Sequence, residues 1–203
     1  HPVYKSSAAS DVYKRQVLVG AVLTGGAGRR MGRTKALVDV GGAPMAQWVI
    51  AALRGAGCVT VTAIGGDPDE LAVLDVAVIA DDHPGEGPLG GIATALRSDA
   101  SPHGADVLAV ACDLPFLGPD ELERIVATAA AHPDADAVVA RTSRREPGCA
   151  LWRPSSHAAV RSAFDDGERA VHRVLDVLRV VDVDLPASSL RNINAPSDLP
   201  GYP

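Results

Sequence analysis

The stretch VLTGGAGRRMGRTK, Val22–Lys35, joins an apolar run to a loop that is rich in glycine and in positive charge. The apolar run, VLVGAVL at 17–23, predicts a buried strand, and helical spacing follows the loop. A loop between a strand and a following helix offers free backbone N–H groups and the positive end of a helix dipole to an anion. The protein has a formal net charge of -6, yet four of its 19 Lys and Arg residues fall between Arg29 and Lys35. We therefore interpret this loop as a phosphate-binding site.

The alternation of strand and helix continues along the rest of the chain. Apolar, β-branched runs predict further strands at 58–64, 76–80, 105–111, 135–140, 148–153 and 179–185. Helical spacing predicts helices at 43–57, 67–74, 87–98, 118–132, 154–164 and 167–178, with a final helical turn within 192–199. Such alternation implies right-handed crossovers and a mainly parallel sheet. The predicted fold is a single-domain α/β structure with three αβα layers and a mostly parallel, Rossmann-like sheet.

Composition agrees with this fold and excludes several classes of function. The 203 residues are 47% hydrophobic but only 3% aromatic, as expected for a Val, Leu, Ala and Ile sheet that is buried on both faces. Trp48 and Trp152 are expected in the core or in a pocket wall. The acidic balance argues against nucleic-acid binding, and the chain lacks the run of about 18 apolar residues that a membrane span needs. Three widely spaced cysteines form no zinc motif, so we expect a reducing cytoplasm.

The first residues need separate treatment. Lys14-Arg15 precedes an apolar run, as in a signal peptide, but the run ends in the glycine loop and not in an A-x-A cleavage site. Residues 1–16 show no periodic pattern and look like foreign or run-on sequence. We expect them to be a non-native or disordered extension and assign the functional domain to 17–203.

Three phosphate motifs compete for the glycine loop. The dinucleotide fingerprint G-x-G-x-x-G fails because Met31 stands at its third glycine, and the Walker motif fails at Ala27 and Arg33. What remains is G-G-x-x-x-R-M-G-x-x-K, which ends at Lys35. Arg makes forked contacts with phosphate oxygens and Lys supplies a point charge, a combination that suits a triphosphate whose pyrophosphate must leave. The alternative is a plain glycine turn with solvated charges.

Asp113 follows the strand at 105–111 directly. Ligand crevices of open α/β sheets lie at the carboxyl ends of their strands, and a carboxylate there suits Mg²⁺ carried with a nucleotide. Asn194 follows the last predicted strand, although asparagine is also a common turn or cap residue. Asp81 ends the strand at 76–80 at the same sheet edge, and with Asp82 beside it one of the two could be only a cap or a solvated acid.

Six motifs in order resemble one family. They are LTGGAGRRMGRTKALVDVGGAPM at 23–45, DDHPGEGPLGGI at 81–92, ACDLPFL at 111–117, REPGCALW at 145–152, DGERAVHRVL at 166–175 and NINAPSDL at 192–199. Together they resemble the molybdenum cofactor guanylyltransferase family of nucleotidyltransferases, whose loop usually reads L-A-G-G-x-x-x-R-M-G-x-x-K. The resemblance covers nearly everything from Val17 to Leu199, and Thr24 departs from it where alanine is usual.

The resemblance implies a nucleotidyltransferase fold and a Mg²⁺-dependent reaction. GMP would pass from GTP to molybdenum-bound molybdopterin, giving the guanine dinucleotide cofactor and pyrophosphate, with molybdoenzyme-maturation proteins as further partners. The resemblance assigns catalysis to Arg30, Lys35 and Asp113, and metal binding to Asp113. It assigns nucleotide binding to Leu23, Thr24, Gly25, Gly26, Lys35, Asp81, Pro88, Leu89, Asp113 and Asn194. It also places Arg141, Arg144 and Arg145 on the acceptor side, where solvated loop charge is an alternative.

Rival functions remain open at this point. A sister enzyme would use CTP with molybdopterin, or an NTP with another phosphorylated acceptor. A protein of another class would bind the nucleotide without chemistry and deliver molybdopterin to apo-enzymes. The Gly26, Arg30, Lys35 and Asp113 set argues for chemistry.

Overall fold

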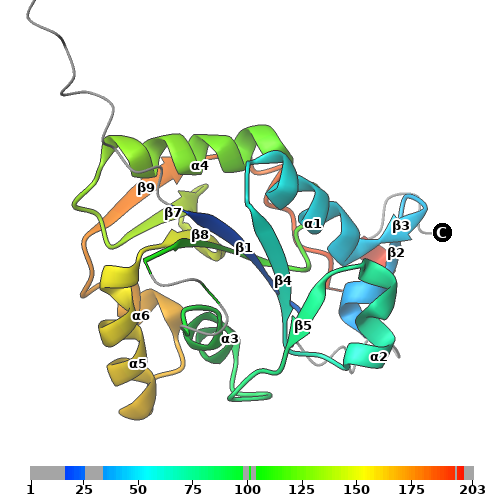
Figure 1. Ribbon diagram of the computed structural model, residues 1–203. Helices are drawn as coiled ribbons and strands as arrows, with labels where there is room; N and C mark the ends of the chain where they lie inside the picture. The colour runs from blue at the N-terminus through cyan, green and yellow to red at the C-terminus, as the bar shows by residue number, and fades with distance from the viewer. Residues whose placement is uncertain (1–16, 26–33, 98–100, 102–103, 195, 199–203) are drawn as a thin grey trace, which may run out of the picture.

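The computed structural model describes residues 17–25, 34–97, 101, 104–194 and 196–198. Within these residues a seven-stranded sheet runs in the order β5-β4-β1-β6-β8-β7-β9 (Figure 1). Its strands are β1 Leu18–Leu23, β4 Thr60–Ile64, β5 Ala77–Ile79, β6 Asp106–Ala111, β7 Ala137–Arg141, β8 Arg145–Trp152 and β9 Val180–Asp184. Predicted and observed strands agree closely, because each is a short apolar run bounded by turn residues.

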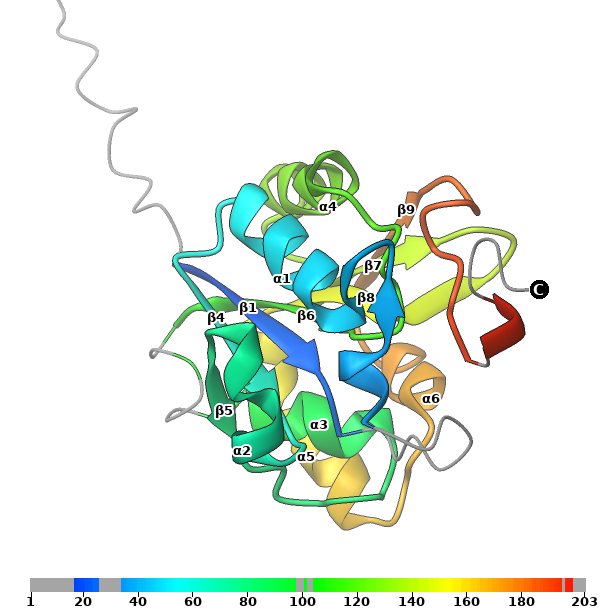
Figure 2. The same cartoon turned by 90° about the vertical axis from the view of Figure 1, so that its right-hand side faces the viewer.

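Helices cover both faces of this sheet (Figures 1 and 2). On one face lie α1 Met45–Gly55 and α4 Pro119–Ala131, and on the other lie α3 Pro88–Ala95, α5 His157–Asp165 and α6 Val171–Leu175. The short α2 Pro68–Leu71 packs near the β4–β5 edge, and four 3-10 turns complete the described helical residues: Lys35–Leu37, Ala72–Leu74, Pro154–Ser156 and Pro196–Asp198. Each face has its own buried apolar cluster. The predicted three-layer αβα fold is therefore confirmed.

The chain reverses its direction of travel across the sheet at β1. From β1 it moves outward through β4 to β5, and then returns to β6 on the other side of β1. All the pairings among β5, β4, β1 and β6 are parallel. A crevice at the carboxyl ends of the strands is expected where the strand order reverses, here between β1 and β6.

The antiparallel strand β8 breaks the parallel pattern. It pairs antiparallel with both β6 and β7, whereas β7 and β9 are parallel. Only residues 142–144 separate β7 from β8, which is too short for the crossover that a parallel pair requires. This hairpin brings the start of β8 to the carboxyl end of β6, where a Cβ on Gly148 would lie 3.3 Å from the Cβ of Ala111.

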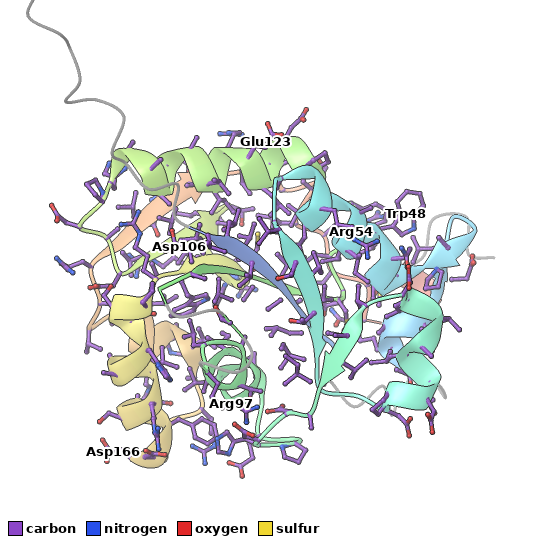
Figure 3. All side chains as sticks on the ribbon, in the orientation of Figure 1. Trp48, Arg54, Arg97, Asp106, Glu123 and Asp166 are labelled. Carbon is purple, nitrogen blue, oxygen red and sulfur yellow. The ribbon has the colours of Figure 1, made fainter. Side chains whose placement is uncertain are left out.

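A small hairpin precedes α1. Strands β2 Asp39–Val40 and β3 Ala43–Pro44 are joined by Gly41 and Gly42, both at positive φ. The helix predicted from residue 43 therefore begins at Met45. Trp152 is buried as expected, but the expectation for Trp48 was wrong: it lies on the outward side of α1 (Figure 3), 43% exposed, and donates from Nε1 to the Val40 carbonyl at 2.7 Å. None of the described helices is long and apolar enough to cross a membrane.

Candidate active site

A cavity of about 450 Å³ opens at the carboxyl ends of β1 and β6. Residues from both sides of the strand-order reversal line it, together with the last residue of β4, residues that follow β5, and the start of β8. The lining residues are Leu23, Gly25, Lys35, Ile64, Asp81, Gly85, Gly87, Pro88, Gly91, Ala111, Cys112, Asp113, Pro147 and Gly148. Its position is the one that the topology predicts for a ligand site.

Three distant segments meet at Lys35. Its Nζ donates to Asp113 Oδ2 at 2.7 Å and to Asn194 Oδ1 at 2.8 Å. The Lys35 and Asp113 side chains are only 16% and 17% exposed, so water screens this ion pair weakly. The backbone also joins these segments, because Ile193 N donates to the Asp113 carbonyl at 3.0 Å. The segment that contains Ile193 and Asn194 therefore packs against the end of β6, and Asn194 lies close to Asp113, the predicted metal ligand.

Asp81 enters the cavity from the end of β5 with a fixed orientation. Its Oδ1 accepts hydrogen bonds from Thr94 Oγ1 and from the His83 backbone N–H, each at 3.0 Å. Its Oδ2 lies 3.3 Å from where a Cβ on Gly25 would stand. One carboxylate oxygen is thus held by α3 and by the loop that precedes it, and the other is turned toward Gly25.

Close contact between two backbones forms the base of the glycine loop. Thr24 N donates to the Ile64 carbonyl at 3.0 Å, and Thr24 Oγ1 donates to the Gly65 carbonyl at 2.6 Å. A Cβ on Gly65, which has φ +77, would lie 2.9 Å from Gly25 Cα. Thr24 is 2% exposed, so its hydroxyl ties the loop to β4. The departure from the usual alanine therefore has a structural reason.

The predicted site residues fall into three groups. Six line the cavity: Leu23, Gly25, Lys35, Asp81, Pro88 and Asp113, and Asn194 contacts one of them. Thr24 and Leu89 are buried, so any contact that they make with a nucleotide would come from their backbone. Gly26 and Arg30 lie outside the described residues. Nucleotide binding by all of these residues stays a prediction.

Some lining residues were not predicted from the sequence. Cys112 and Gly85 reach the cavity because they lie close in sequence to Asp113 and Asp81. Ile64 reaches it because it pairs with Leu23 at the ends of β4 and β1. Pro147 and Gly148 reach it through β8, whose antiparallel pairing was not among the predictions. Burial and the negative Asp113 nearby raise the pKa of the Cys112 thiol to about 12, and Lys35 opposes them to a smaller extent. Cys112 therefore forms part of the wall and is not a nucleophile.

The three arginines predicted for the acceptor side are paired with acids. Arg141 contacts Asp184 at 2.8 Å, and Arg145 contacts Asp182 at 2.7 Å. Arg144 lies 3.5 Å from Glu146 and is 84% exposed. Their charge is largely neutralised by these neighbours, which favours the alternative of solvated surface charge.

The donor set fits a magnesium ion that arrives with a nucleotide. No group of three or more His, Cys, Asp or Glu side chains that could hold a metal occurs among the described residues. Mg²⁺ is usually held by one or two carboxylates together with substrate phosphates and water. Asp113, with Lys35 on only one of its two oxygens, can supply such a carboxylate.

Comparisons with known proteins give matches over most of the chain. A family model described as the MobA-like NTP transferase domain matches residues 20–183. The chain is similar to a molybdenum cofactor guanylyltransferase of Rhodobacter capsulatus, at 34% identity over 90% of this chain and 93% of the relative. One from Cereibacter sphaeroides is 35% identical over the same shares.

Solved structures also match over most of the chain. The molybdopterin-guanine dinucleotide biosynthesis protein A from Archaeoglobus fulgidus superposes with a TM-score of 0.72 at 28% identity, covering 88% of this chain and 93% of that one. A protein from Aquifex aeolicus superposes with a TM-score of 0.74, covering 91% and 96%, but at 18% identity it supports the fold alone.

Proposed function

Because the chain belongs to the molybdenum cofactor guanylyltransferase family of MobA-like NTP transferases, we propose that it transfers GMP from GTP to molybdenum-bound molybdopterin. The products are the molybdopterin guanine dinucleotide cofactor and pyrophosphate. The observation that carries the proposal is the Lys35–Asp113 pair, in a cavity at the reversal of strand order that Gly25 also lines.

The reaction needs positioning and charge neutralisation more than proton transfer. The terminal phosphate of molybdopterin is already an anionic nucleophile, so its in-line attack on the α-phosphorus requires no strong general base. Lys35 can leave Asp113 for the phosphates and offset charge on the departing pyrophosphate, and the backbone at Gly25 lies close enough to cradle the same group. Bound Mg²⁺ would neutralise phosphate charge, and Asp113 would hold it.

The choice of guanine rests on the relatives, which are named molybdenum cofactor guanylyltransferases.

Thermal stabilisation by the four nucleoside triphosphates tests this choice of base. With Mg²⁺ present, a triphosphate at 100 times its Kd adds about 2.7 kcal/mol of stability. We expect GTP to stabilise the protein more than CTP, ATP or UTP at equal concentration. Equal or greater stabilisation by CTP would overturn the guanylyl assignment and leave the reaction class in place.

The Asp113→Asn variant tests the metal site. It keeps the size of the side chain but loses the charge that attracts Mg²⁺, so turnover should fall by orders of magnitude, at the several kcal/mol typical of a metal contribution. GTP affinity measured in chelator should change little or tighten, because a negative charge near the phosphates is gone. Near-normal turnover would remove Asp113 from the metal site.

A further inference from the structure

The loop that walls the cavity between β5 and α3 is held from outside by the segment that joins α5 to α6. Figure 3 places Asp166 at the outer end of α5, where this segment begins. The segment carries Arg169, within the motif DGERAVHRVL, whose role the proposed reaction leaves unexplained. The loop carries Glu86 between Gly85 and Gly87, both of which line the cavity.

Arg169 is fixed on several sides at once. Its Nε donates to Glu86 Oε2 at 2.7 Å, and its Nη2 lies 2.5 Å from the same oxygen. Its Nη1 donates to the carbonyls of Phe164 and Glu168, at 2.9 and 2.7 Å. Its guanidinium carbon stands 3.8 Å from the centre of the Phe164 ring. An isolated exposed ion pair holds little, but these combined contacts give the guanidinium one position.

The same aromatic ring supports the start of the loop. The His83 ring lies 4.0 Å from the Phe164 ring, centre to centre. A Cβ on Gly90 would lie 2.9 Å from His83 Cβ and 3.4 Å from Phe164 Cε2, so α3 is packed tightly against both. Phe164 thus contacts the loop at His83, and Arg169 binds it at Glu86.

The cavity wall at Gly85 and Gly87 presents no side chain that could pack, although the Glu86 backbone N–H donates to the His83 carbonyl at 3.1 Å. Gly85 and Gly87 have φ of +83 and +89, and a Cβ built on either would meet nothing within 4 Å. A glycine backbone in open space has many accessible conformations. The position of this wall therefore depends on what holds Glu86.

We propose that Arg169 is a positioning residue for the nucleotide cavity, because it fixes Glu86 and through it the Gly85–Gly87 wall. The inference rests on the proposed function, since it treats the cavity as the triphosphate site. Loss of the Arg169–Glu86 contact loosens one wall and lowers nucleotide affinity. It affects global stability little, because both side chains are nearly half exposed.

The test is a double-mutant cycle on GTP affinity in the full chain. We expect Arg169→Ala and Glu86→Gln each to raise the Kd for GTP about tenfold, or about 1.4 kcal/mol. The double variant should be no worse than either single one, because both remove the same contact. Arg169→Lys keeps the charge without the fork and should recover only part of the affinity. Melting temperatures of the nucleotide-free variants should match that of the wild type.

Arg161→Ala is the matched control. Arg161 also pairs with an acid, Asp165 at 3.8 Å, but on α5 and away from the cavity lining, so its loss should leave the Kd unchanged. Additive effects in the cycle, an unchanged Kd in Arg169→Ala, or a loss of affinity explained by lowered melting temperature would each overturn the inference alone. A wild type without measurable GTP binding would instead refute the proposed function, and this inference with it.

Discussion

Lys35 pairs with the carboxylate that the metal is proposed to use. Its Nζ lies 2.7 Å from Asp113 Oδ2, and its second contact is the neutral Asn194. Metal binding to the free protein must therefore displace or repel an ammonium group, whereas a bound triphosphate would draw Lys35 away. We expect the Lys35→Met variant, which keeps the length but loses the charge, to bind a divalent cation more tightly than the wild type when no nucleotide is present.

The size of the effect follows from the contact. A hydrogen bond between charged groups contributes about 1.5 to 3 kcal/mol, and the low exposure of both side chains limits screening by solvent. At about 1.4 kcal/mol per factor of ten, the cation affinity should rise about 10- to 100-fold. The same variant should bind GTP more weakly while its affinity for guanosine stays close to that of the wild type, because only the triphosphate needs the charge.

Mn²⁺ titration followed by electron paramagnetic resonance measures this affinity without turnover. Asn194→Ala is the matched control, because it removes a neutral partner of Lys35 and leaves the ion pair, so its Mn²⁺ affinity should stay near that of the wild type. Adding Asp113→Asn to Lys35→Met should abolish the gain. Mn²⁺ binding by Lys35→Met that is no tighter than in the wild type would refute the competition between Lys35 and the metal.

Two further predictions concern the frame of the site and the pH dependence of stability. Gly65→Ala should destabilise the protein by about 2 to 4 kcal/mol, because it places a Cβ 2.9 Å from Gly25 Cα and also carries the penalty of an alanine at positive φ. Gly57→Ala, with φ +89 and open space around its Cβ, should carry only the positive-φ penalty of about 1 to 2 kcal/mol. Equal losses of stability in chemical denaturation would show that the close approach of Gly65 to Gly25 is not rigid. Burial raises the pKa of Asp106 from 3.8 to about 6, against a smaller opposing effect of Arg153, and its Oδ1 has no hydrogen-bond partner among the described residues. Between pH 3.8 and about 6, Asp106 therefore binds more protons in the folded state than in the unfolded state. The stability that its neutral form contributes is fully present below pH 3.8 and is lost as pH rises through 6. Asp106→Asn should be more stable than the wild type at pH 7 by about 3 kcal/mol, and the difference should vanish near pH 3. A pH-independent difference in denaturation midpoints would contradict this.

Much of the fold could be predicted because its strands are short apolar runs separated by clear turn residues. That alternation placed Asp81 and Asp113 at one sheet edge without any knowledge of their contacts. The antiparallel β8 was also within reach, because residues 142–144 leave no room for a crossover. The Gly41-Gly42 pair is likewise a hairpin signal that an interpretation based on helical spacing overrode.

The side-chain network of the site could not be predicted in the same way. Lys35 contacts residues 78 and 159 positions away, and such contacts depend on how the final segment docks onto β6. The approach of Gly65 to Gly25 depends on how the two backbones leave adjacent strands, which no local pattern encodes. The arginines at 141 and 145 read as available charge in the sequence, because their acidic partners at 184 and 182 lie on another strand.

Pyrophosphate release from GTP, measured with and without molybdenum-bound molybdopterin, tests the central claim most directly. The account predicts release that requires molybdopterin and Mg²⁺ together, is faster with GTP than with CTP, and matches the formation of the guanine dinucleotide one to one. GTP binding without any molybdopterin-dependent pyrophosphate release would contradict it and would leave a protein that binds the nucleotide without transferring it.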